Sequence, residues 1–226
     1  NEQWISKLDF RDKELYFEDI SKFDPDFIFH LGAHTSLEYC ESNIEDAYIT
    51  NTLAAENATN ISNYLEIPIL YISTAGIFDG QKEIYDDWDM PNPLGTYARS
   101  KYMGELFVQN NNSRHLICRA GWMMGSGPKK DKKFIQKIMK QIKEGNQNLN
   151  IVNDKLGTPT YTIDFANNVK LLLENNQWGL YNMVCKGLTS RFEVTENILK
   201  ILNLDKKISI NQVDSSFFSR EYFAPR

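Results

Sequence analysis

Cysteine is scarce in this sequence, and the few thiols lie far apart. The chain has 226 residues and three cysteines, Cys40, Cys118 and Cys185. An odd and scattered set of this kind excludes a disulfide framework and a cysteine-based zinc motif, and it is typical of a reducing compartment. We therefore expect a cytoplasmic protein without a bound metal ion.

Long apolar runs and an excess of basic residues are also lacking. No apolar run approaches the roughly 20 residues that span a bilayer, and the polar first residues do not resemble a signal peptide. The formal net charge of −5 gives no electrostatic reason to expect nucleic-acid binding. We expect neither a membrane nor a nucleic acid as a partner.

The composition that is present fits a globular domain, and the order of elements indicates its class. Apolar residues make up 42% of the chain and charged residues 24%, which is ordinary for a protein with a sizeable core. Strands alternate with helices, which predicts an α/β fold: a Rossmann-like, doubly wound parallel sheet covered on both faces. The predicted strands cover residues 27–33, 68–73, 115–120 and 149–152, and the helices 44–65, 97–110, 132–144 and 162–175.

Beyond Trp178 the spacing of apolar residues changes. A strand over 180–185, a helix over 193–202 and a strand over 207–213 predict a small C-terminal α/β lobe. We expect residues 1–155 to form the Rossmann-like domain, with residues 156–176 also packed on it, and residues 177–226 to form the smaller lobe.

One pair of residues has the chemistry of carbonyl reduction. Tyr97 and Lys101 lie four residues apart on a predicted helix, so they share a face. When hydride reaches a carbonyl carbon the oxygen must take a proton, and a nearby ammonium lowers the pKa of a phenol from its usual value near 10. A hydroxyl from Ser73 or Thr74, at the end of the preceding strand, is suited to hold the substrate oxygen.

The alternative for this pair is an exposed tyrosine beside an unrelated lysine, because a chain of this composition holds about one such spacing by chance. The position of the pair favours the catalytic reading. In an open α/β sheet, ligands bind at the carboxyl ends of the strands, and this rule selects residues 31–36, 73–78 and 120–127.

The sequence around these positions resembles a known family. Three motifs follow one another: Ile-Ser-Thr-Ala-Gly-Ile-Phe-Asp-Gly at 72–80, Asn-Pro-Leu-Gly-Thr-Tyr-Ala-Arg-Ser-Lys-Tyr-Met-Gly-Glu at 92–105, and Arg-Ala-Gly-Trp-Met-Met-Gly at 119–125. Gly-Thr-Pro-Thr-Tyr follows at 157–161. This succession resembles the dTDP-4-dehydrorhamnose reductase family of extended short-chain dehydrogenases/reductases. The resemblance runs from about Leu8 to the end, and the second motif is its most specific part.

The resemblance implies roles for individual residues. Thr74 is the hydroxyl partner, Tyr97 is the proton donor, and Lys101 binds the nicotinamide ribose and tunes Tyr97. Trp122 resembles the residue that packs near the sugar nucleotide, so the substrate-binding set is Thr74, Tyr97 and Trp122. Asn51 resembles the helix asparagine that supports the water and lysine network. The cofactor-binding set is Asp9 and Phe10 beside the adenine, Leu31, Gly32 and Ala33 beside the ribose and phosphates, then Asn51, Ser73, Tyr97 and Lys101.

Two departures from the family pattern affect these expectations. Ala75 and Gly76 stand where the family commonly has Asp-Tyr, which puts the identity of the sugar in doubt. No glycine-rich turn precedes the adenine segment, although such a turn lets a backbone approach a pyrophosphate at a helix N-terminus. We therefore expect that the N-terminal βαβ portion of the fold is missing from this sequence.

The function implied by the resemblance is NADPH- or NADH-dependent reduction of a 4-keto-6-deoxy sugar nucleotide, with hydride delivered to C4, in dTDP-rhamnose and polysaccharide biosynthesis. A homodimer is implied in the same way. Two alternatives stay open. One is a sugar-nucleotide epimerase or dehydratase, which shares the three catalytic residues. The other is a non-catalytic binding subunit similar to the regulatory subunit of methionine adenosyltransferase.

Overall fold

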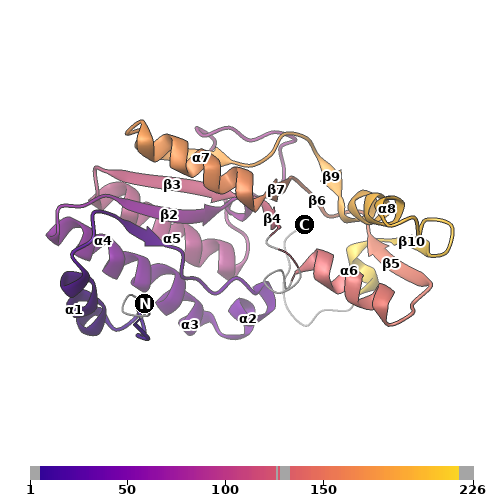
Figure 1. The fold of residues 1–226 in the computed structure, drawn as a ribbon, viewed down its shortest axis with the longest axis horizontal. Coiled ribbons are helices and arrows are strands. Elements are labelled where there is room, and N and C mark those ends of the chain that lie inside the picture. The colour runs from indigo at the N-terminus through magenta and orange to yellow at the C-terminus, as the bar shows by residue number, and fades with distance from the viewer. Residues whose placement is uncertain (1–5, 126, 128–132, 219–226) are drawn as a thin grey trace. The chain divides into compact units, whose positions relative to one another are not determined.

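The structure is a computed structural model, and it describes residues 6–125, 127 and 133–218. The chain forms two compact units (Figure 1). The first contains residues 6–120 and 169–183, and the second contains the described residues from 121 to 168 and from 184 to 218. Within the described part of the chain, no helix is both long and apolar enough to cross a membrane.

A parallel four-stranded sheet forms the centre of the first unit (Figure 1). Every neighbouring pair of its strands is parallel, so the carboxyl ends of the strands meet at one edge. β2 is almost wholly buried, as expected for a strand covered on both faces. In sheet order, the strands are β1 (Ile28–His30), β2 (Ile69–Thr74), β3 (His115–Ala120) and β8 (Gly179–Met183).

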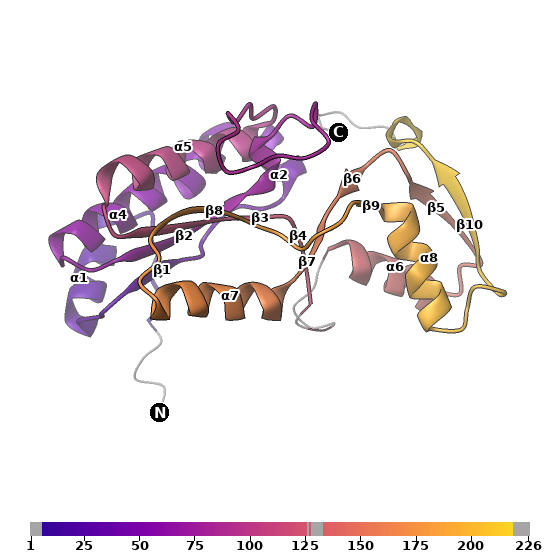
Figure 2. The ribbon, with the colours of Figure 1, turned by 90° about the horizontal axis from the view of Figure 1, so that it is seen from above.

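Helices cover both faces of this sheet (Figure 2). On one face lie α1 (Lys13–Phe23), α4 (Ala54–Tyr64) and α5 (Thr96–Asn111), and on the other lies α7 (Thr162–Glu174), which belongs to the first unit from Val169 onward. Apolar side chains of α4 and α5 pack on the sheet and form its main core. The core cluster consists of Ile28, Ala55, Ala58, Ile61, Ile69, Tyr71, Val108 and Ile117.

The helix predicted over residues 44–65 is confirmed as a continuous helical run, but it is not regular. It consists of α3 (Ile44–Tyr48), the π-helical turn η1 (Ile49–Leu53) and α4. Single π-helical turns inside helices occur often at functional sites. The structure also contains α2 (Leu37–Ser42) and α1, neither of which the sequence analysis predicted.

The second unit is a smaller α/β assembly. β5 (Asn148–Val152) and β10 (Ser209–Val213) form a parallel pair. Residues of α6 (Phe134–Lys143) and α8 (Arg191–Ile201) pack with this pair around Leu149 and Ile151. The remaining elements are short: β4 (Trp122–Met124), β6 (Leu156–Gly157), β7 (Pro159–Tyr161), β9 (Thr189–Ser190) and the 3-10 turn η3 (Ser215–Phe217).

The predicted α/β class and parallel sheet are confirmed, but two strands have other partners than expected. The strand predicted over 180–185 is β8, and it pairs with β3 in the main sheet rather than within the C-terminal lobe. The strand predicted over 149–152 is β5, and it pairs with β10 rather than within the Rossmann-like sheet. A short apolar run predicts a strand but not its neighbour in the sheet, because the pairing depends on residues far away in the sequence.

Helix α5 approaches the π-helical turn so closely that residue 104 must lack a side chain. A Cβ atom on Gly104 would lie 2.7 Å from the backbone oxygen of Asn51 and 2.7 Å from the hydroxyl of Tyr71. Both atoms belong to buried residues, so neither can move away cheaply. Gly104 therefore sets the spacing between α5 and the turn.

We expect Gly104→Ala to lower the free energy of unfolding of the full-length protein by about 1–3 kcal/mol, the usual cost of overpacking. This loss should occur although alanine has the higher helix propensity. Urea unfolding followed by circular dichroism measures the change. Gln109→Ala, an exposed position on the same helix, is the matched control and should change stability by no more than about 0.5 kcal/mol. Equal stabilities for the two variants would contradict the close contact.

Candidate active site

The end of β2 and the start of α5 bring the predicted catalytic hydroxyls together. Thr74 is the last residue of β2, and Tyr97 lies in the first turn of α5. The Tyr97 side chain lies close enough to that of Thr74 for Thr74 to lower the pKa of Tyr97, while Thr74 Oγ1 accepts a bond of 3.1 Å from the backbone N–H of Gly76. The start of α5 is held by Glu41, whose carboxylate accepts from the Thr96 backbone N–H at 2.6 Å. Two anchored elements therefore set the Thr74–Tyr97 pair.

The pKa of Tyr97 is raised above its usual value of 10. Burial is the main cause, the neighbouring Thr74 side chain offsets part of it, and the nearby thiol of Cys40 adds to the rise. The sequence analysis expected Lys101 to lower this pKa, and in the structure the net direction is the opposite. Burial outweighs the favourable contacts because it removes the water that would stabilise a phenolate.

Lys101 is buried beneath the start of α5 with its charge over an aromatic ring. Its side chain is 3% exposed, and its Nζ lies 4.0 Å from the centroid of the Tyr71 ring. The Tyr71 hydroxyl in turn donates to the Lys101 carbonyl at 2.9 Å. Burial lowers the pKa of Lys101 to about 7, although the negative charge of Glu105 acts in the opposite direction. The ammonium is therefore close to its titration point at neutral pH.

Asn51 lies in the π-helical turn η1 and joins three parts of the first unit. Its Oδ1 accepts from the His34 backbone N–H at 2.8 Å, and its Nδ2 donates to the His34 carbonyl at 3.1 Å and to Ser100 Oγ at 3.0 Å. Asn51 is fully buried, so these bonds satisfy groups that would otherwise be costly to bury. The amide fixes the loop after β1 against α5, one residue from Lys101.

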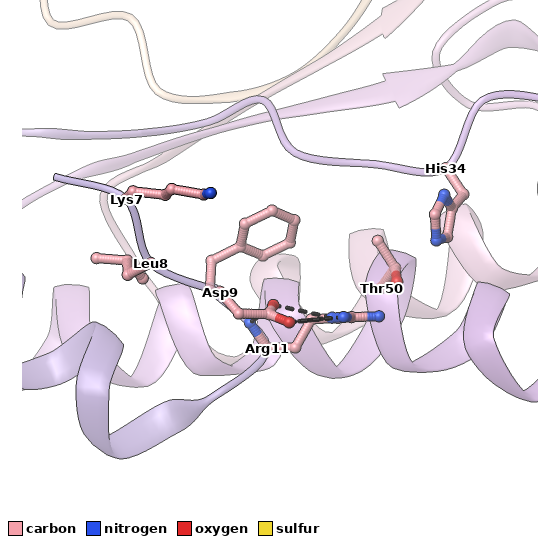
Figure 3. Close-up of a pocket in the computed structure, with 7 residues that line it drawn as sticks. Lys7, Leu8, Asp9, Arg11, His34 and Thr50 are labelled. Carbon is pink, nitrogen blue, oxygen red and sulfur yellow. Dashed lines mark hydrogen bonds and ion pairs between the residues drawn. The ribbon is translucent and has the colours of Figure 1, made fainter. Parts of the chain in front are cut away.

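The predicted adenine segment lines a cavity of about 480 Å³. Lys7 lies on one side of this cavity and His34 and Thr50 on the other (Figure 3). Asp9, Phe10 and Arg11 form the wall between them. The cavity thus combines an aromatic ring with charged groups of both signs.

The Phe10 ring reaches into the loop after β1. A Cβ atom on Gly32 would lie 2.6 Å from the tip of this ring, so the approach needs glycine at that position. The edge of the ring faces His30, with ring centroids 5.8 Å apart. Leu31, by contrast, is 65% exposed. The structure therefore brings Phe10 and Gly32 together and leaves Leu31 at the surface.

Arg11 is fixed at the cavity by two carboxylates. Its guanidinium contacts Asp9 at 2.6 Å (Figure 3) and Asp46 at 2.8 Å. Asp46 also accepts from the Tyr39 hydroxyl at 2.7 Å and lies 2.7 Å from His34 Nε2. The hydrogen bonds from Arg11 hold the pKa of Asp9 at about 2. The carboxylates orient the guanidinium, so Arg11 stands as an ordered cation at the cavity wall.

The family of this chain follows from comparison with known proteins. The model of the family described as "RmlD substrate binding domain" matches residues 3–225. The chain belongs to this family. It is 29% identical over 187 residues to the spore coat polysaccharide biosynthesis protein SpsK of Bacillus subtilis, which covers 82% of the chain and 64% of SpsK. It is 32% identical over 143 residues to the dTDP-4-dehydrorhamnose reductase of Sinorhizobium fredii, which covers 63% of the chain and 47% of that protein.

The fold of this chain is also similar to solved structures of dTDP-4-dehydrorhamnose reductases. The dTDP-4-dehydrorhamnose reductase from Yersinia enterocolitica matches with a TM-score of 0.89 and 35% identity, over 96% of this chain and 76% of the other. The enzyme from Bacillus anthracis, solved in complex with NADP, matches with a TM-score of 0.90 and 26% identity, over 100% of this chain and 77% of the other. The chain thus spans less than two thirds of the curated relatives named above, and its resemblance to the reductase family is confirmed.

The first unit also contains a buried charge cluster that was not predicted from the sequence. Glu105 is fully buried on α5 and forms an ion pair of 2.6 Å with Arg119 of β3. Ser73 donates to the same carboxylate at 2.5 Å. The signal was present in the sequence, because Glu105 follows Lys101 by four residues and so lies on the face that carries Tyr97.

Trp122 belongs to the second unit and lies on β4. There the guanidinium of Arg191 lies 5.5 Å from the Trp122 ring centroid. A Cβ atom on Gly157 would lie 2.4 Å from the same ring, so the Gly-Thr-Pro-Thr-Tyr motif begins with a residue that makes room for tryptophan.

We expect Lys101 to make the free energy of unfolding rise with pH. Its folded pKa of about 7 lies below its unfolded value of about 10.4. Between these values the unfolded chain binds more protons, so the free energy of unfolding rises with pH. Urea unfolding between pH 7 and 8.5 should show this rise in the full-length protein, below the range in which buried thiols act in the opposite direction.

Lys101→Met keeps an unbranched side chain and removes the charge, so it should flatten this rise. Lys170→Met, at an exposed position on α7, should leave the pH dependence unchanged. A rise of the same slope in Lys101→Met and in the original protein would show that Lys101 does not titrate in this range.

Proposed function

We propose that the full-length protein is an NADPH-dependent reductase of a 4-keto-6-deoxy sugar nucleotide, with dTDP-4-dehydrorhamnose as the first candidate substrate. The observation that carries the proposal is the closeness of the Thr74 and Tyr97 side chains where β2 ends and α5 begins, with Lys101 one turn further along α5. Relatives of this chain are named dTDP-4-dehydrorhamnose reductase. NADH is the alternative reductant.

Three residues of the chain each have one role in the proposed reaction. Thr74 holds the carbonyl oxygen of the sugar by a hydrogen bond. Tyr97 then gives its phenolic proton to that oxygen as it gains negative charge. The raised pKa of Tyr97 supports this role, because the group stays protonated at neutral pH and is available as a donor. Lys101 stabilises the phenolate left behind.

The cofactor would supply hydride to C4 of the sugar. On the cavity side, Asp9 and Phe10 would flank the adenine, and the residues after β1 (Leu31, Gly32, Ala33) would border the ribose and phosphates. Asn51 and Ser73 would support the cofactor from η1 and β2, with Tyr97 and Lys101 at the nicotinamide end. The Arg11 guanidinium at the cavity wall and the contact between the tip of the Phe10 ring and Gly32 support a nucleotide in this cavity.

In the second unit, Trp122 would contact the sugar nucleotide. We place the reaction in the cytoplasm and, as the name of one relative suggests, in polysaccharide biosynthesis. A homodimer is part of the same proposal. The functional division into a cofactor domain over 1–155, with 156–176 packed on it, and a substrate lobe over 177–226 also stays a prediction.

Tyr97→Phe in the full-length protein should lower kcat for NADPH oxidation with dTDP-4-dehydrorhamnose by about 10²–10⁴-fold, because the proton donor is lost. NADPH affinity and the melting temperature should change little. Tyr102→Phe removes a hydroxyl from the same helix, away from Thr74, and is the matched control; it should keep near-normal kcat. Near-normal turnover in Tyr97→Phe would overturn the assignment.

The contact between Phe10 and Gly32 gives a separate test of the cofactor cavity. Gly32→Ala should displace the Phe10 ring and weaken NADPH binding by roughly tenfold or more, which corresponds to about 1.4 kcal/mol. In a Phe10→Ala background the same glycine substitution should cost little, because its clash has been removed. Calorimetric titration of the four proteins measures the coupling. Additive losses would mean that the ring does not transmit the effect.

A further inference from the structure

The buried face of α5 continues past the proposed catalytic pair to a carboxylate. Tyr97, Lys101 and Glu105 follow one another at intervals of four residues and therefore share one face of the helix. Lys101 is 3% exposed and Glu105 is fully buried. Two opposite charges thus lie on successive turns of α5 within the apolar layer between helix and sheet. A buried charge of either sign is costly unless other groups stabilise it.

Glu105 has a complete set of partners on the sheet. Arg119 Nη2 donates to Oε1 at 2.6 Å, and Arg119 Nε lies 3.2 Å from both carboxylate oxygens. Ser73 Oγ donates to Oε2 at 2.5 Å. Arg119 is itself placed by the ring of Phe78, 5.3 Å from its guanidinium carbon, and by Asn182 Oδ1 at 3.4 Å. The carboxylate is therefore fixed and linked to β2 and β3.

Ser73 precedes Thr74 on β2, so this bond acts at the strand end where the candidate site lies. Removing the carboxylate would leave the Ser73 hydroxyl and the Arg119 guanidinium without their main buried partner. The ion pair alone is weak evidence for a stabilising role, because a buried pair often adds little compared with apolar side chains. What distinguishes this pair is its position between Lys101 and the end of β2.

Several charged and titratable groups surround Lys101. Glu105 and Tyr97 share its helix, Tyr71 lies beneath it on β2, and His30 on β1 is close enough that Lys101 helps to lower the pKa of His30 to about 3. From α2, Cys40 acts on Tyr97 and Glu41 holds the start of α5. Within this set, Glu105 is the group that favours the charged form of Lys101. Arg119 fixes that carboxylate from β3.

We propose that Glu105 is a positioning residue of the reductase site: its negative charge acts on Lys101, one turn away on the buried face of α5, and its carboxylate, together with Arg119, holds Ser73 at the end of β2. This inference rests on the proposed function for its effect on turnover. Its effect on Lys101 does not depend on the reaction. Glu105 touches no reacting atom and acts only through Lys101 and Ser73.

The first experiment measures the titration of Lys101 directly in full-length protein without substrate. NMR of protein with isotopically labelled lysine gives the pKa, and the spectrum of Lys101→Met identifies the signal. Glu105→Gln should lower the pKa of Lys101 by roughly one unit, the size of effect expected for a neighbouring charge. Glu105→Asp keeps the charge on a shorter side chain and should preserve most of the original pKa.

Glu105→Gln leaves Arg119 as a lone buried cation, which can prevent folding. The double variant Glu105→Gln with Arg119→Met removes both charges and avoids this problem. Because removing the Arg119 cation favours the charged form of Lys101, the double variant should show a smaller fall in the pKa of Lys101 than Glu105→Gln. Ser73→Ala removes the hydroxyl but leaves the carboxylate, so it separates the two roles: the pKa of Lys101 should stay as in the original protein.

The second experiment measures kcat for NADPH oxidation as a function of pH. In Glu105→Gln, the loss of activity at high pH should begin about one unit lower than in the original protein, because Lys101 loses its proton earlier, whereas in Glu105→Asp it should begin near the original pH. A purely structural ion pair would change stability and leave both the pKa of Lys101 and this pH limit in place, and that result would overturn the inference. If the original protein reduces no keto sugar, the proposed function fails while the titration of Lys101 still decides the role of Glu105.

Discussion

The closeness of α5 to the π-helical turn at Asn51 sets the geometry of the candidate site. Gly104 lies against the backbone oxygen of Asn51 and the hydroxyl of Tyr71, with no room for a side chain. The Tyr71 hydroxyl then bonds to the carbonyl of Lys101, which belongs to the same helix. Because Tyr97, Lys101 and Glu105 are carried by α5, all three take their positions from this one contact. The distance of α5 from the sheet and its rotation therefore decide where these three side chains lie.

Burial acts on the two proposed catalytic groups in a way that spacing along the sequence does not reveal. The layer between helix and sheet shields these groups from solvent, so it disfavours the phenolate of Tyr97 and the ammonium of Lys101 alike. The pKa of the tyrosine rises and that of the lysine falls to about 7. Both groups therefore shift toward their neutral forms. A proton donor gains from this environment, whereas a cation needs a compensating negative charge.

The sequence predicts features that depend on local spacing. The positions of Tyr97 and Lys101 on one helix follow from their four-residue interval, and the proximity of Thr74 to Tyr97 follows from the rule that strand ends form the site. The pairing of Glu105 with Arg119 could not be predicted in this way, because it depends on how α5 is rotated above β3. The same holds for Arg11 and Asp46, which are 35 residues apart. The π-helical turn has no distinct signal in the apolar pattern.

The order in which the strands of the main sheet appear along the chain has a consequence for biosynthesis. β8 completes the sheet beside β3, yet residues 121–168, which belong to the second unit, are synthesised between them. Residues 121–168 must therefore leave the ribosome before β8 can form its hydrogen bonds with β3. Until then β3 presents an open parallel edge, and such edges pair readily with other chains. Slow elongation through residues 121–183 would lengthen the time during which the nascent protein needs protection by chaperones.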